Sequence, residues 1–121
     1  MGTYQNHMKL YRHFKDDAEN EDNHKASRAE LYFLSAFHLI EACAAKGRVH
    51  INKHQKIRVI LENNSSIFEN KTEIIWRASQ NIENKLRPKF TYGFSWDDKD
   101  FAVLTDEYRK IEQICLDNLE V

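Results

Sequence analysis

Residues 29–44 read AELYFLSAFHLIEACA, and apolar side chains cover almost the whole circumference of this segment when it is wound into a helix. Its polar positions fall on one narrow stripe. A helix that is apolar nearly all round is usually the buried, central helix of a larger helical domain. We therefore predict a central helix from His24 to Lys46, with the rest of the chain packed around it.

Four amphipathic segments flank this central helix. Their apolar residues recur every three or four positions, which places them along one face of a helix. The predicted helices cover residues 3–19, 53–62, 71–87 and 98–119. Asn52 and Asn70 are the predicted N-caps of the second and third of these helices, because each is followed three residues later by a Gln or Glu that can complete a capping box. Ser66 and Glu69 offer the third helix an alternative start.

Glycine and proline are scarce in this sequence. It has three Gly and one Pro, whereas average usage would give about eight and six in a chain of this length. A β-sandwich needs turn residues about every 8–12 positions, and a dinucleotide- or phosphate-binding loop needs clustered glycines, so the composition argues against both. The expected fold class is all-α: a single domain over residues 1–121, built as an up-and-down bundle of four or five helices. Gly47 is the predicted left-handed C-cap of the central helix, and Pro88 is predicted to end the helix that precedes it.

The segment from Lys89 to Asp98 alternates aromatic and other residues. Phe90, Tyr92, Phe94 and Trp96 follow the two-residue period of a strand. A single strand without a partner leaves its backbone hydrogen bonds unmade, so we predict an aromatic-rich loop folded across the helix ends. Together with Arg87, Tyr92 makes this loop a candidate platform for stacked bases, and the alternative role of its rings is to fill the core.

Charge, cysteine and histidine usage exclude several further classes. The net charge of −1 argues against a protein that coats nucleic acid non-specifically. Cys43 and Cys115 lie in apolar helical runs and are expected to be free, buried thiols. The six His residues belong to no HExxH pattern and are accompanied by no CxxC pair, so neither a metal site nor a cofactor is expected. No apolar run approaches 18 residues and no signal-peptide pattern is present, so we expect a cytoplasmic protein without membrane association.

The segment between Gly47 and His54 is the first candidate site, because it brings Arg48, His50 and His54 into one short loop. A neutral imidazole can take the proton from an RNA 2′-hydroxyl, and a guanidinium can hold the phosphate while charge develops on it. We therefore assign Arg48 and His54 as candidate catalytic residues and His50 as a candidate binding residue. The alternative interpretation is that all three are solvated or structural side chains.

The polar stripe of the central helix holds the second candidate site. His38 and Glu41 are three residues apart and share one face of the helix, so they form a candidate binding or catalytic pair. The alternative is a core or interface histidine whose hydrogen bonds are satisfied. On another edge, Ala29, Ala36 and Cys43 repeat every seven residues and allow a second helix to approach closely, either from the same chain or from a dimer partner.

The sequence resembles the HEPN domains, small helical nucleotide-binding or RNase domains of prokaryotes. The run from Ala29 to Ala42 is similar to their second helix, with its Phe-His pair followed by an acidic-Ala pair. A short loop then leads to Lys53-His54, and the segment from Leu86-Arg87 to Tyr92 is similar to the family's Leu-x-x-Arg followed by a tyrosine.

The resemblance implies a four- or five-helix bundle, usually a homodimer, that binds RNA or nucleotides. In active members it also implies an Arg-x(4–6)-His motif that cleaves RNA without a metal, and five residues separate Arg48 from His54. The resemblance also implies a second possibility, since many relatives without the standard motif look like non-catalytic binding modules, often beside a nucleotidyltransferase partner. It thus implies a toxin–antitoxin or defence setting. The alternative function is a non-catalytic dimer that binds a partner protein through the acidic end of the first helix and the aromatic loop.

Overall fold

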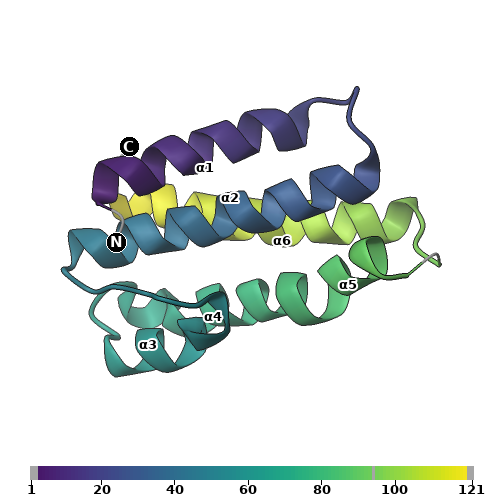
Figure 1. Ribbon diagram of the computed structural model, residues 1–121. Coiled ribbons are helices and arrows are strands. Elements are labelled where there is room, and N and C mark those ends of the chain that lie inside the picture. The colour runs from purple at the N-terminus through teal and green to yellow at the C-terminus, as the bar shows by residue number, and fades with distance from the viewer. Residues whose placement is uncertain (1–2, 94, 120–121) are drawn as a thin grey trace.

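The computed structural model describes residues 3–93 and 95–119, and most of these residues are helical (Figure 1). The α-helices are α1 (Tyr4–Glu19), α2 (Lys25–Lys46), α3 (Ile57–Asn63), α4 (Thr72–Gln80), α5 (Arg87–Thr91) and α6 (Asp98–Leu119). The other helical elements are the 3-10 turns η1 (His54–Lys56) and η2 (Glu69–Lys71) and the π-helical segment η3 (Asn81–Leu86). The predicted all-α bundle is therefore confirmed.

Helix α2 lies at the centre of the bundle. It packs against α1, α6, α5 and α4, so neighbouring helices meet it around much of its circumference. Figure 1 shows the up-and-down course of the chain: α1 and α2 run antiparallel, the α4–η3–α5 rod runs back beneath them, and α6 returns behind α2. The near-continuous apolar surface of residues 29–44 is therefore largely buried, as predicted, and Leu39 and Ile40 are fully buried.

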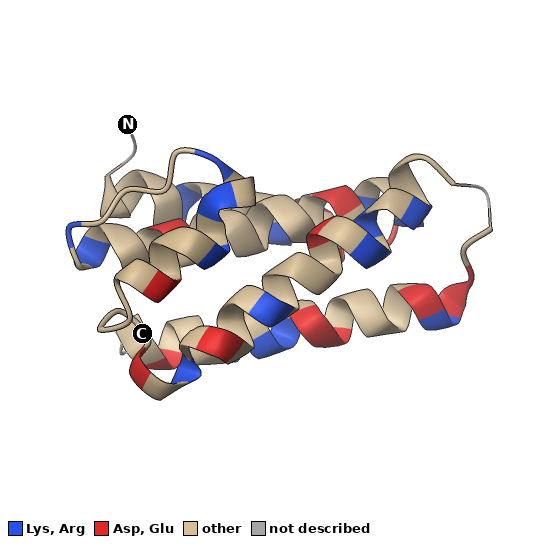
Figure 2. Cartoon of the chain, turned by 90° about the horizontal axis from the view of Figure 1, so that it is seen from below, with Lys and Arg blue, Asp and Glu red and all other residues tan. Residues whose placement is uncertain are grey.

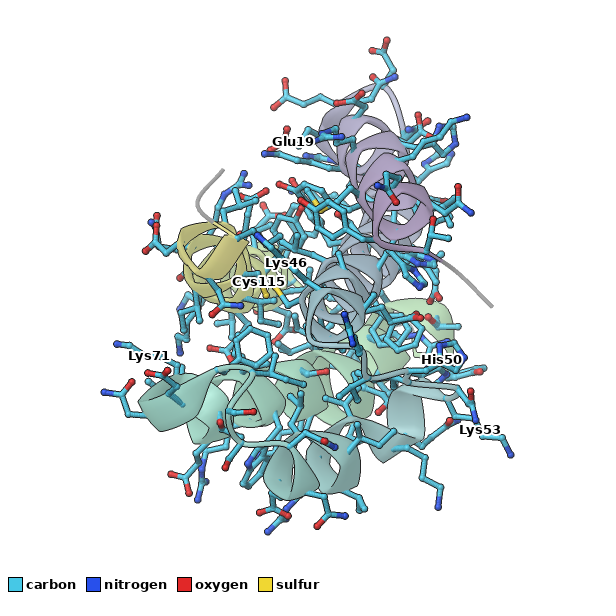
Figure 3. The ribbon with its side chains drawn as sticks, turned by 90° about the vertical axis from the view of Figure 1, so that its left-hand side faces the viewer. Glu19, Lys46, His50, Lys53, Lys71 and Cys115 are labelled. Atoms are coloured by element: carbon cyan, nitrogen blue, oxygen red, sulfur yellow. The ribbon has the colours of Figure 1, made fainter. Side chains whose placement is uncertain are left out.

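The small-residue edge of α2 is covered within the same chain. Ala29, Ala36 and Cys43 are all buried, and the Sγ atom of Cys43 lies 3.6 Å from the carbonyl oxygen of Cys115 in α6. Figure 3 shows Cys115 between α6 and the end of α2. Both thiols are free and buried, as predicted. The partner of this edge is therefore a helix of the same chain, which leaves the edge unavailable to a second copy.

Pro88 does not end the fourth predicted helix, so this prediction is wrong. The α4, η3 and α5 segments form one helical rod from Thr72 to Thr91, with Pro88 in the first turn of α5. The N–H of Arg87 donates to the carbonyl of Ile82, five residues back, as in a π-helix. This wider turn shifts the hydrogen-bond ladder, and Pro88 then occupies a first-turn position where a missing N–H costs little.

The rod also changes the predicted aromatic loop. Phe90 is helical and buried, and its ring lies 4.9 Å from that of Trp96. The connection to α6 begins only at Tyr92, and Phe94 lies outside the described residues. The rings of Phe90 and Trp96 therefore serve the core, whereas Tyr92 is exposed.

The predicted caps of α2, α3 and α4 are also incorrect. Gly47 has a φ of −89°, and the left-handed residue is Arg48, with a φ of 63°. The N–H of Arg48 donates to Ala45 and the N–H of Val49 donates to Ala44, which is the hydrogen-bond pattern of a Schellman motif with arginine in the glycine position. Neither Asn52 nor Asn70 caps a helix, because η1 begins after Lys53 and α4 after Lys71, without side-chain caps.

Replacing Arg48 with glycine should raise the free energy of unfolding by about 0.5–1 kcal/mol, because glycine adopts the left-handed conformation without the steric cost that a Cβ imposes. Arg48→Ala keeps the Cβ and is the matched control, which we expect to leave stability close to that of the parent chain. Urea denaturation followed by circular dichroism measures both. If the glycine variant were less stable than the alanine variant, the steric cost of a Cβ in the left-handed conformation would not control stability at position 48.

Candidate functional site

His54 opens the short η1 turn and lies against the central helix. Its ring meets the rings of Phe33 and Phe37 of α2 edge-on, with centroids 5.2 and 5.8 Å away. Its Nδ1 atom is hydrogen-bonded to the carboxylate of Glu83, which comes from the π-helical segment η3. The two aromatic rings and the carboxylate together hold the imidazole in one orientation.

Arg87 lies beside this histidine, at the start of α5. Its Nε donates to Oε1 of Glu30 at 2.8 Å, and its guanidinium lies 4.5 Å from the centre of the Phe33 ring. Two elements distant in sequence therefore meet over α2. We call His54, Glu83, Arg87 and Glu30 the His54–Arg87 site.

The environment keeps the imidazole of His54 neutral near pH 7. Burial lowers the pKa of His54, the positive charge of Arg87 lowers it further, and Glu30 acts in the opposite direction. The hydrogen bond to Glu83 is best made by the Nδ1–H tautomer, which leaves the lone pair on Nε2. The His54 side chain is 30% exposed, so solvent and solutes can reach it. This is the arrangement of a general base oriented by a carboxylate.

The surroundings of the site offer cationic side chains for phosphate groups and an exposed aromatic ring for stacking. A shallow groove beside it is lined by Glu30, Arg87 and Thr91, among others. The next residue along the chain, Tyr92, is 76% exposed. On the other side, residues 48–61 contain no Asp or Glu, and they include four cationic side chains, Arg48, Lys53, Lys56 and Arg58.

The cationic segment is local, because elsewhere both signs of charge are interspersed along the helices (Figure 2). Figure 3 shows His50 and Lys53 on the same side of the molecule. Lys53 and Lys56 are exposed, and over residues 3–93 and 95–119 no ion pair engages either of them. Their charges are available to a solution anion.

Sequence reasoning found two members of the His54–Arg87 site and missed two. His54 and Arg87 were both predicted, in separate roles, and the structure brings them together. Glu83 and Glu30 were missed, since nothing in their local sequence distinguishes them from other surface carboxylates. Arg48 is exposed at the end of α2, and the contacts of the described residues include none between Arg48 and His54.

A second cluster contains the predicted pair His38 and Glu41 together with His7 of α1. Nε2 of His7 lies 3.1 Å from Oε2 of Glu41, and Nδ1 of His7 lies 3.2 Å from Nδ1 of His38. Nδ1 of His38 is 3.8 Å from Oε1 of Glu41. We call these three residues the His7–His38–Glu41 cluster. The spacing in α2 predicted two of its members, whereas His7 comes from another helix.

Burial governs the electrostatics of this cluster. It raises the pKa of Glu41 to about 7 and lowers the pKa of His38 to about 4, with the neighbouring His7 adding to the second effect. Burial also lowers the pKa of His7, and the charge of His50 lowers it further. His50 is itself exposed, and no hydrogen bond or ion pair among the described residues joins it to this cluster. His38 is additionally stacked on Phe14, with ring centroids 5.6 Å apart.

Comparisons with known proteins place no relative beside this chain: no protein-family model, curated protein or solved structure matches it. Among the described residues, no helix is both long and apolar enough to cross a membrane. The two side-chain clusters are therefore the features of this chain that bear on its function.

Proposed function

We propose that this chain binds single-stranded RNA along the His54–Arg87 site and cleaves it without a metal, as the resemblance to HEPN domains leads us to expect. The observation that carries the proposal is a neutral, carboxylate-oriented histidine whose neighbouring cation is an arginine. In this proposal the arginine that acts with His54 is Arg87 rather than Arg48, because Arg87 is the cation whose charge reaches the imidazole.

The chemistry follows from the roles of the two side chains. Nε2 of His54 takes the proton from a ribose 2′-hydroxyl, and the 2′-oxygen forms a bond to the adjacent phosphorus. The bond from phosphorus to the 5′-oxygen breaks, and that oxygen takes a proton from water. The products are a 2′,3′-cyclic phosphate and a 5′-hydroxyl end. Arg87 stabilises the charge that develops on the phosphate oxygens.

The Glu30 ion pair is compatible with this role. It engages Nε of Arg87, which leaves the two terminal amino groups of the guanidinium as donors for a phosphate. The flanking Lys53 and Lys56 contact the RNA backbone, and Tyr92 stacks on a base at the other end of the groove. The proposal also includes three features that rest on the resemblance alone. They are homodimerisation, a nucleotidyltransferase partner, and a toxin–antitoxin or defence setting.

The His54→Ala variant should cleave end-labelled single-stranded RNA about 10²–10⁴ times more slowly than the parent chain in the presence of EDTA. Arg87→Ala should lose about 100-fold, whereas Arg48→Ala should stay near the parent rate. The parent rate should decline in acid only at a lower pH than an ordinary imidazole would give, because burial and Arg87 lower the pKa of His54 and the base must be neutral.

The matched control is His13→Ala, which removes an exposed histidine from α1, 65% exposed and outside the site. Circular dichroism of each variant shows that the fold is retained. Absence of cleavage by the parent chain, or an unchanged rate in His54→Ala, removes the catalytic proposal. RNA binding, measured by fluorescence anisotropy, then tests the binding part of the proposal. Binding that is weakened by Arg87→Ala supports a non-catalytic RNA-binding protein. No binding at all favours the protein-interaction alternative.

A further inference from the structure

The His7–His38–Glu41 cluster plays no part in the proposed RNA chemistry and has a composition that a structural role alone does not require. Two imidazoles and one carboxylate converge from α1 and α2, and His7 and Glu41 are each only 5% exposed. One ligand atom from each residue lies within 4.8 Å of the others. Two His and one Glu or Asp form a common ligand set for zinc in proteins.

The three side chains are close enough together for one metal ion to reach all of them. Zn–N and Zn–O bonds of about 2.0–2.2 Å place neighbouring ligands of a tetrahedral zinc about 3.4 Å apart. The shortest separations are 3.1 Å from Nε2 of His7 to Oε2 of Glu41, 3.2 Å from Nδ1 of His7 to Nδ1 of His38, and 3.8 Å from Nδ1 of His38 to Oε1 of Glu41. They involve both ring nitrogens of His7 and both oxygens of Glu41. A metal ion takes only one nitrogen from His7, and one atom from each residue brings the three ligands to within 4.8 Å of one another. Zinc binding therefore requires the His7 ring or the Glu41 side chain to move closer to the other ligands.

The charges in the cluster also favour a cation. Glu41 is buried, and within the described parts of the chain its ion-pairing partners are only His7 and His38, with no lysine or arginine among them. A buried carboxylate without a cationic partner is costly, whereas a divalent metal ion would supply the missing positive charge.

From this geometry we infer that His7, His38 and Glu41 bind one zinc ion, with the fourth coordination position open to water. The ion joins the N-terminal part of α1 to the second half of α2 and so stabilises the packing of these two helices. The site is separate from the His54–Arg87 site, and its occupancy does not enter the proposed cleavage.

The test uses the full chain, freed of metal by dialysis against EDTA and then titrated with zinc chloride. Equilibrium dialysis with elemental analysis should find one zinc ion per chain. Because the ion binds the folded state, the melting temperature should rise by about 5–10 °C when free zinc reaches about 100 times the dissociation constant.

Two variants remove a ligand while keeping the local shape. Glu41→Gln retains an acceptor for His7, and His38→Phe retains the ring that packs between Phe14 and Phe37. Each should weaken zinc binding by about 100-fold or more. His13→Ala, which removes an exposed histidine, should bind zinc like the parent chain.

Zinc binding of parental strength by Glu41→Gln and His38→Phe, both shown to be folded by circular dichroism, would overturn the inference and assign the metal to surface histidines. A parent chain whose melting temperature does not respond to zinc would also overturn it. The cluster would then be a polar network that is satisfied by its own hydrogen bonds.

Discussion

Replacing Tyr108 with alanine should lower the free energy of unfolding by about 3–5 kcal/mol, which is the usual cost of removing a large aromatic side chain from a core. Tyr108 lies in α6 and is fully buried. Its ring packs 4.8 Å from that of Tyr32 in the central helix. Since domains of this kind are stable by only about 5–15 kcal/mol, the variant should be partly unfolded or close to it at 37 °C.

The hydroxyl group of Tyr108 adds a smaller, separable contribution. Its oxygen lies 2.9 Å from Oγ of Ser35 and 3.3 Å from Oε2 of Glu112. Tyr108→Phe keeps the ring and removes only these hydrogen bonds, so it should cost about 1–2 kcal/mol. Urea denaturation with a common m-value measures both variants. If the alanine and phenylalanine variants were equally unstable, the ring's packing would not be the main term.

Replacing Glu112 with glutamine, which removes the charged carboxylate, should lower the free energy of unfolding by about 2–3 kcal/mol at pH 7. The change leaves several polar partners without their charged acceptor in a largely buried site. The Tyr11 hydroxyl donates to Oε2 of Glu112 at 2.6 Å, and Nζ of Lys15 lies 2.8 Å from the same oxygen. Arg109 pairs with the other oxygen at 3.5 Å. Lys15 and Arg109 are partly exposed, so solvent compensates part of their loss.

Glu112 should also make the free energy of unfolding depend on pH in the acid range. Burial alone would raise the pKa of Glu112, but the hydrogen bonds from Lys15 and Tyr11 outweigh burial and leave the pKa lowered. A carboxyl group whose folded pKa lies below its unfolded pKa stabilises the fold above the unfolded value, about 4.3, and this contribution is lost as the pH falls through the folded pKa.

Glu112→Gln is the variant that tests this dependence, because it keeps the shape and removes the charge. Below about pH 4 its stability should decline less steeply than that of the parent chain. Asp106→Asn removes an exposed carboxylate from the same helix and is the matched control. Parallel acid unfolding curves for the parent chain and Glu112→Gln would show that the lowered pKa of Glu112 does not contribute to stability.

Several helix boundaries were predictable because their signals are local. The predicted helix over residues 98–119 agrees with α6, where Asp97 accepts a hydrogen bond from the backbone N–H of Asp100. The predictions failed where a residue's usual behaviour was overridden by its neighbours. A π-helical turn accommodates Pro88, and Arg48 takes the left-handed position expected of Gly47.

The sequence by itself determined the helices and the all-α class, because apolar periodicity depends only on residues a few positions apart. The candidate sites were decided by tertiary structure. His54 and Glu83 are 29 residues apart, and His7 and His38 are 31 apart. Contacts at such separations exist only when helices pack side by side, and no local pattern along the chain records which polar side chains will then meet.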